Sequence, residues 1–151
     1  MGEIAATNRK AHFRYQVLDT LEAGIVLAGS EVKSIRDHAV SFNDSYARVE
    51  DDEVFVHNLE ISPYDKATID VVASQRRRKL LLHRSEIRKL KGKLRERGLT
   101  LVPLKVYFNE RGFAKLTLGI AKGKTLGDKR ETLKKREAQT EMRRAMGLRR
   151  R

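Results

Sequence analysis

Two alternating runs in the last third of the chain restrict its fold more than any other feature. They read LVPLKVYF (101–108) and FAKLTLGI (113–120), and apolar and polar residues alternate along most of each. A period of two is typical of a β-strand with one buried face. The short segment 109–112 between them predicts the turn of an antiparallel hairpin. Pro103 cannot donate a hydrogen bond to a ladder, so it predicts an edge or a bulge.

Further short strands are predicted upstream. Alternation begins at His12, and a turn at 22–24 separates this strand from a second one at 25–27. Two strand-like runs flank Asp51 and Asp52 and predict another hairpin. The remaining elements are two helices, one capped by Ser30 and one that is capped by Ser85 and extends through Arg97.

Short antiparallel strands with two inserted helices predict a mainly β fold, a β-barrel with short α-helices. The OB-like antiparallel barrel is one candidate, and barrels of this kind often bind nucleic acid.

The basic charge is distributed unevenly. The formal net charge is +13. Residues 122–151 hold twelve Lys or Arg and four Asp or Glu, a net of +8, which leaves +5 for the first 121 residues. We predict a polar, mobile N-terminal segment (1–11), an OB-like barrel (12–121) and a basic C-terminal tail (122–151) that a partner orders. Such a charge favours a polyanion, and nucleic acid is the abundant one.

Composition excludes several classes of protein. The chain has no cysteine, so disulfides, thiolate metal sites and cysteine nucleophiles are excluded. It has no signal-peptide pattern and no run of about 18 apolar residues. We expect a soluble, cytoplasmic protein with no membrane partner.

The segment GIAKGKTLGDKRE (119–131) is close to a phosphate-binding P-loop but does not match one. Three residues, not four, separate Gly119 from the Gly123-Lys124 pair, and Gly119 lies inside a strand-like run. This excludes a nucleotide site. Two interpretations stay open: a solvated loop, or a hinge whose lysines contact RNA.

No pattern in the chain is typical of catalysis. The four histidines lack the spacing of metal ligands, and Ser34 and Ser41 lie near His38 only along the sequence. We therefore predict no enzymatic activity, no metal and no cofactor. The run Arg76–Lys79 is either a random basic patch or an edge that grips phosphates.

Six segments together resemble the small protein B (SmpB) family, the bacterial partner of transfer-messenger RNA (tmRNA). They are NRKA (8–11), EAGIVLAGSEVKSIR (22–36), DSYARV (44–49), RRRKLLLHRSEI (76–87), LVPLKVYF (101–108) and AKGKTLGDKRE (121–131). They occur in order, at family-like spacing, through almost the whole chain. Residues 72–74 and Gly127 depart from residues that are frequent in relatives.

The resemblance implies an OB-like barrel and a tail that is disordered in solution and helical on the ribosome. It also implies trans-translation, the rescue of stalled ribosomes. The protein would bind the tRNA-like domain of tmRNA, support its aminoacylation and deliver it with elongation factor Tu. The tail would occupy the decoding centre and the empty mRNA path, in contact with small-subunit rRNA. We expect a monomer.

The resemblance further implies individual contacts. The RNA-binding residues would be Asn8, Arg9, Lys10, Glu31, Lys33, Ser34, Arg36, Arg76, Arg78, Lys79, Lys122, Gly123 and Lys124. Asp128, Lys129 and Arg130 would contact the decoding centre. Two rival functions stay open: an RNA-binding or ribosomal OB protein without a rescue role, and an RNA-modifying enzyme, which would need a buried acid, histidine or metal cluster.

Overall fold

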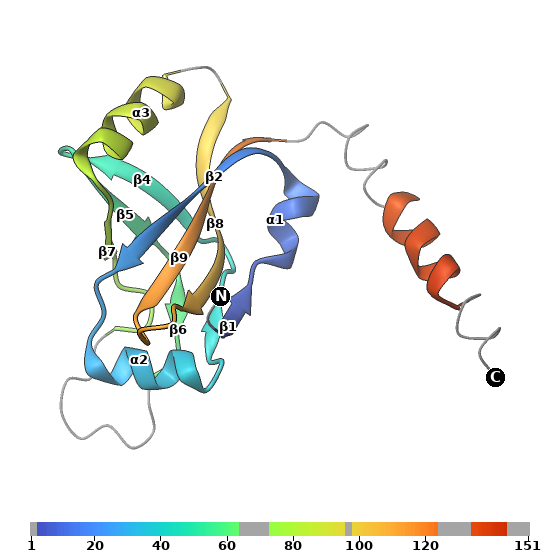
Figure 1. Cartoon of the computed structure of the whole chain (residues 1–151), viewed down its shortest axis with the longest axis horizontal. Coiled ribbons are helices and arrows are strands. Elements are labelled where there is room, and N and C mark those ends of the chain that lie inside the picture. The colour runs from blue at the N-terminus through green and yellow to red at the C-terminus, as the bar shows by residue number, and fades with distance from the viewer. Residues whose placement is uncertain (1–2, 64–72, 96–97, 124–133, 145–151) are drawn as a thin grey trace.

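The structure is a computed structural model that describes residues 3–63, 73–95, 98–123 and 134–144 (Figure 1). In chain order its elements are β1 (Ile4–Thr7), α1 (Arg9–Arg14), β2 (Tyr15–Ile25), α2 (Gly29–Arg36), β3 (Val40–Ser41), β4 (Tyr46–Glu50), β5 (Glu53–His57), β6 (Glu60–Ile61), β7 (Arg78–Leu81), α3 (Arg84–Leu94), β8 (Leu99–Phe108) and β9 (Ala114–Gly123). Residues 134–144 form a further, unlabelled helix. The prediction of a mainly β fold with short helices is confirmed.

One antiparallel sheet contains most of the strands. Its hydrogen-bonded order is β1-β8-β4-β5-β7-β2-β9, and β9 also pairs with β8. The pairings from β8 through β4, β5, β7, β2 and β9 therefore return to β8. The short strands β3 and β6 pair with each other. The assignment to the OB-like class stays a prediction.

The two predicted hairpins are confirmed. In the β8–β9 hairpin the register runs from Leu99–Lys122 to Phe108–Ala114, and it shifts just after Pro103, where a bulge was expected. In the β4–β5 hairpin, Asp51 and Asp52 both have a positive φ, at 48° and 62°. Aspartate tolerates this left-handed conformation in two-residue turns, which explains why the acidic pair lies there.

The N-terminal part of the chain differs from the prediction. In place of a mobile segment over 1–11, the described residues from Glu3 onward include β1, which pairs with β8, and helix α1. The alternation that begins at His12 crosses the end of α1 into β2. That strand then continues to Ile25 without a turn at 22–24, because β9 supplies partners for it as far as Gly24.

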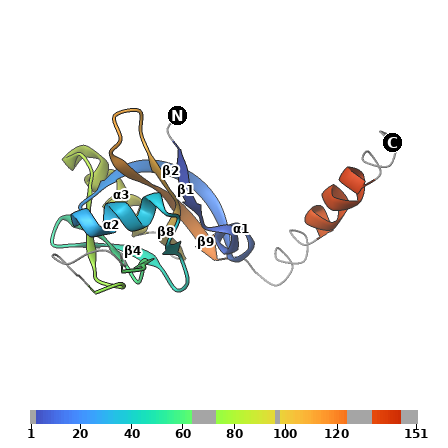
Figure 2. The same ribbon diagram turned by 90° about the horizontal axis from the view of Figure 1, so that it is seen from below.

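The apolar faces of α2 and α3 lie on the core. Ile35 of α2 is fully buried and Leu90 of α3 is 2% exposed, with Ile87 and Leu94 packed beside it. Both helices were predicted, although each begins two residues earlier than expected, because the caps are Ala28 and His83 and not Ser30 and Ser85. In Figures 1 and 2, α1 and α3 lie apart, with β2, β8 and β9 between them. None of the described helices has the length and apolar character that a membrane span requires.

Candidate nucleic-acid interface

Asn8 fixes the entry of the chain into α1. Its Nδ2 donates a hydrogen bond to the Pro103 carbonyl (2.7 Å), and its backbone N–H donates to the Leu104 carbonyl (2.7 Å). Asn8 is buried, whereas Arg9 and Lys10, which follow it, are exposed. The side-chain amide of Asn8 therefore hydrogen-bonds to β8, and this contact positions the two cations that follow it.

The end of β9 lies beside the start of β2. Gly123 pairs with Tyr15 and Lys122 pairs with Gln16. Because Tyr15 directly follows α1, the exposed Lys122 and Gly123 lie at the same end of the sheet as the α1 cations (Figure 1). The structure thus brings together residues that are far apart in sequence. The remaining predicted contacts of this region, Lys124, Asp128, Lys129 and Arg130, fall outside the described residues.

A groove of about 510 Å³ opens beside these cations. The α1 side of the groove contributes Arg9, Lys10 and Arg14. The opposite side comes from the segment before and into β4 and contributes Ser41, Asn43, Asp44, Ser45 and Tyr46. Cationic side chains bind phosphates, and amides and hydroxyls bind base edges and 2′-hydroxyls. We call the exposed α1 cations, Lys122, Gly123 and this groove the α1 corner.

The helix at 134–144 contacts the α1 corner through one side chain. The Arg136 guanidinium donates to the Arg9 carbonyl (3.5 Å) and lies 6.0 Å from the centre of the Phe13 ring. Every residue of this helix is exposed. A helix with so little burial gains little stability from the body of the protein.

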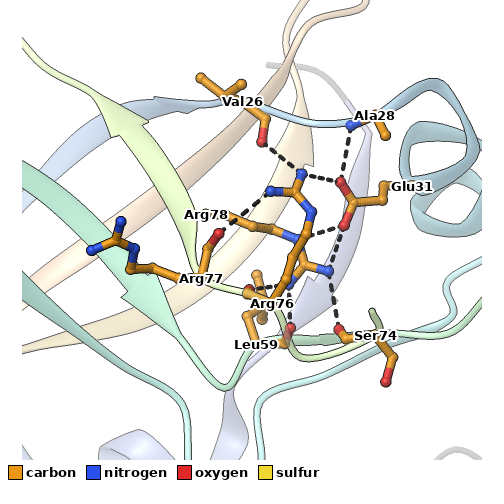
Figure 3. A network of polar contacts seen from close by, with 8 residues as sticks. All are labelled: Val26, Ala28, Glu31, Leu59, Ser74, Arg76, Arg77 and Arg78. Atoms are coloured by element: carbon orange, nitrogen blue, oxygen red, sulfur yellow. Dashed lines mark hydrogen bonds and ion pairs between the residues drawn. The ribbon is translucent and has the colours of Figure 1, made fainter. Parts of the chain in front are cut away.

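A second set of predicted contacts forms a buried network at α2 (Figure 3). The Glu31 carboxylate accepts hydrogen bonds from Arg76, from Arg78 Nε (2.7 Å) and from the Ala28 N–H (2.9 Å). Arg78 also donates to the Leu59 carbonyl and to the Ser74 carbonyl (3.0 Å). Arg78 is fully buried and Glu31 is 3% exposed. The network joins α2 to the start of β7.

Electrostatics keep this network ionised. Burial raises the pKa of Glu31, but hydrogen bonds from Arg76, the Ala28 N–H and Arg78 outweigh it, so the pKa lies below its usual value. Burial lowers the pKa of Arg78, and the Glu31 carboxylate partly offsets this. The buried pair is therefore a carboxylate and a guanidinium, which bind each other and fill their remaining hydrogen bonds with neighbouring groups.

Three predicted RNA contacts of this second set are buried, as Asn8 is in the first. Glu31, Ser34 and Arg78 are at most 3% exposed in this structure, so their side chains do not face a ligand. The helical period explains this for α2, because residues 31, 34 and 35 lie on one face and Ile35 is in the core. The Glu31 carboxylate accepts from Arg76 and Arg78, so its oxygens are already occupied within the protein.

The other predicted cations of this set are accessible. Lys33, Arg36 and Lys79 are exposed, and Arg76 is 30% exposed. The Arg36 guanidinium lies 4.6 Å from the centre of the Phe108 ring, and Lys79 Nζ is 2.8 Å from Glu53. These residues lie around α2 and β7, away from the α1 corner (Figure 1). The predicted contacts therefore divide into two separate groups.

Two surface features were not predicted from the sequence. On the outer face of β4 and β5, the Tyr46 and His57 rings stack at 5.0 Å, and Arg77 lies 4.0 Å from the Phe55 ring. The alternation of apolar and polar residues in DSYARV places Tyr46 on the outer face, so the sequence did indicate an exposed aromatic ring there.

The second feature is a groove of about 890 Å³ beside Leu81, which is 53% exposed and packs over Gly24. Alternation in the run Leu80-Leu81-Leu82 could have indicated that the middle leucine faces outward. The side chains of this basic run also alternate: Arg78 points inward, whereas Arg77 and Lys79 are exposed.

The other sequence expectations concern nucleotides and metals. Gly119 lies within β9, and a Cβ there would be 3.0 Å from Leu104 Cδ1, so close packing explains this glycine. Among the described residues, no three His, Cys, Asp or Glu side chains are grouped so that they could hold a metal ion.

Comparisons with known proteins agree with this architecture. The family model described as SmpB protein matches residues 5–148. The chain is 51% identical to the SsrA-binding protein of Chlorobaculum tepidum over 91% of this chain and 88% of the relative. It is 54% identical to that of Geobacillus kaustophilus over 95% and 92%, respectively. A solved structure, described as "tmRNA-SmpB: a journey to the center of the bacterial ribosome", is similar with a TM-score of 0.69 and 51% identity, over 85% of this chain and 93% of that one.

Proposed function

The chain belongs to the SmpB family, and we propose that it binds the tRNA-like domain of tmRNA and acts in trans-translation. The observation that carries this proposal is the α1 corner, where cations of α1 and of the end of β9 meet beside a polar groove. The names of the relatives and of the similar structure support the identity of the RNA.

The α1 corner has the chemistry that structured RNA requires. Arg9, Lys10 and Lys122 are exposed and suit phosphates, and the groove supplies amide, hydroxyl and aromatic groups. Phosphate contacts give affinity and orientation, whereas contacts to bases and 2′-hydroxyls give selectivity. This combination favours a folded RNA with exposed nucleotides over a uniform duplex.

The second group of cations extends the proposed contact. Lys33, Arg36, Arg76 and Lys79 would meet further phosphates of the same RNA or of the ribosome. Glu31 and Arg78 would act indirectly, by holding α2 and the start of β7 in place. Ser34, buried on the inner face of α2, would act through packing.

The tail would act on the ribosome. We assign Lys124 to RNA binding and Asp128, Lys129 and Arg130 to the decoding centre, with the following helix in the empty mRNA path beside small-subunit rRNA. Delivery with elongation factor Tu and support of tmRNA aminoacylation belong to the same proposal. The exposed, basic helix at 134–144 suits an RNA-lined channel, since it has little apolar surface to bury elsewhere.

A gel-shift comparison tests the proposed function. The full-length protein is titrated onto the tRNA-like domain of tmRNA and onto an unrelated tRNA at about 150 mM salt, where non-specific phosphate binding is suppressed. A clear preference for the tmRNA fragment is expected. Equal, steeply salt-dependent binding to both RNAs would instead favour a general RNA-binding protein without a rescue role.

A further inference from the structure

The outer face of α3 carries a dense positive charge that the proposed function leaves unused. Residues 84–95 contain six Lys or Arg and one Glu, a net of +5. Leu90 points into the core, so the helical period places Ser85, Arg88 and Gly92 on the opposite side, with Lys89 beside them, and all four are exposed. Arg95 continues this face at the end of the helix.

Two ion pairs flank this face and attach α3 to the body. Lys91 pairs with Asp52 of the β4–β5 turn, and Lys93 Nζ lies 2.9 Å from Asp19 of β2. In the described part of the chain, Arg88, Lys89 and Arg95 form no ion pair. The acidic groups near α3 thus neutralise its edges, and Arg88 shares a groove with Asp51, Asp52 and Glu53 without pairing with them. The charge of Lys89 and Arg95 has no acidic partner in the described part of the chain.

Gly92 lies in the middle of this outer face. Glycine inside a helix costs stability relative to alanine. A Cβ at position 92 would have no atom of the described structure within 4 Å, and the backbone there needs no positive φ. Neither packing nor conformation therefore requires this glycine. A missing side chain does permit close approach of a ligand to the helix backbone.

We propose that the outer face of α3, formed by Ser85, Arg88, Lys89, Gly92 and Arg95, binds the phosphate backbone of a second RNA helix. The cations from Arg88 to Arg95 extend over about 10 Å of helix axis, enough to meet successive phosphates of one strand. No aromatic residue lies in α3, so the face suits phosphates rather than stacked bases. α3 lies apart from α1, with strands between them in both views, so two RNAs can bind at once (Figures 1 and 2).

The inference depends on the proposed function in one respect: the first RNA is taken to be the tRNA-like domain of tmRNA, called the tmRNA fragment below.

A binding experiment tests the inference. The full-length protein is saturated with the tmRNA fragment, and a fluorescent RNA duplex of about 16 base pairs is then titrated in at several salt concentrations. The test variant is R88Q/K89Q. The control is R48Q/R111Q, which removes the same two charges from exposed positions elsewhere.

We expect R88Q/K89Q to weaken duplex binding about tenfold and to reduce the log–log salt slope by about 1 to 2. The affinity of R88Q/K89Q for the tmRNA fragment should stay within about twofold of wild type. The control variant should bind both the duplex and the tmRNA fragment within about twofold of wild type. Equal effects of the two variants on the duplex would overturn the proposal. So would an equal loss of tmRNA binding in R88Q/K89Q, because α3 would then belong to the first site.

Gly92→Gln separates binding from folding. Glutamine is the better helix former, so thermal stability should rise, while the added side chain should weaken duplex binding. Unchanged duplex affinity in this variant would contradict the close approach. Displacement of the duplex by polyglutamate as effectively as by unlabelled duplex would assign the face to acidic proteins instead. If wild type fails to prefer the tmRNA fragment, the proposed function fails, and duplex binding to the free protein still tests α3.

Discussion

At the scale of single residues, the distinction that matters is between cations that face solvent and those that hold the fold. Arg78 and Lys79 are neighbours, yet one is fully buried against Glu31 and the other is exposed beside Glu53. A buried charge without its partner is costly, whereas an exposed pair contributes little. The two positions should therefore respond very differently to substitution.

Glu31→Gln is expected to lower the free energy of unfolding by about 3–5 kcal/mol, because Arg78 keeps its charge and loses its counterion. Lys79→Gln is the matched control and should cost less than about 1 kcal/mol. Urea denaturation followed by circular dichroism measures both. Similar small losses in the two variants would contradict the buried ion pair.

The same carboxylate predicts a dependence on pH. The pKa of Glu31 is lower in the folded protein than in the unfolded chain, so its contribution to stability is fully present above the unfolded value of about 4.3. That contribution is lost as pH falls through the folded pKa. The difference in unfolding free energy between wild type and Glu31→Gln should thus be largest near neutral pH and shrink below about pH 4. A difference that stays constant over this range would count against the account.

At the scale of elements, regular alternation predicted the fold best. Both hairpins, around Asp51-Asp52 and around 109–112, were predicted because their strands have one buried face and their turns have turn residues. The structure at the start of the chain was not predicted, because α1 is only six residues long and its last residues continue the alternation of β2. A single long strand also accommodates Gly24, whose place in the sheet depends on distant partners in β7 and β9.

The β8–β9 turn offers a test at this scale. Gly112 has φ +81°, a left-handed conformation that is costly for other residues. Gly112→Ala should lower the free energy of unfolding by about 1–2 kcal/mol. Gly29→Ala, at a helical position with open space, should be neutral or stabilising. Thermal unfolding measures the stability of both variants. A Gly112→Ala variant as stable as wild type would exclude strain at the turn.

At the scale of the whole molecule, sequence could indicate which residues are basic but not which of them meet. Arg9 and Lys122 lie at one corner because β2 and β9 pair in a particular register, and no local pattern contains that information. The burial of Glu31 likewise depends on Arg78, 47 positions away. The candidate site could thus be predicted as a set of cations, and the structure divides that set into an α1 corner, a second group around α2 and β7, and buried supports.

Removal of the tail tests the proposal that the α1 corner binds tmRNA and that the tail acts on the ribosome. A protein truncated after Lys124 keeps every described strand and the α1 corner, so its affinity for the tmRNA fragment should stay within about threefold of wild type. It should lose tagging activity on stalled ribosomes, because the segment assigned to the decoding centre is gone. Loss of tmRNA binding in this truncated protein would place the tail in the first RNA site.

The most direct measurement is the affinity of R9Q/K10Q for the tRNA-like domain of tmRNA at about 150 mM salt, beside R48Q/R111Q with the same change in charge. Two lost phosphate contacts at the α1 corner should weaken binding about tenfold and lower the salt slope by about 2, with the control within about twofold of wild type. Equal losses in the two variants would mean that net charge alone drives binding, and would contradict the α1 corner as the tmRNA site.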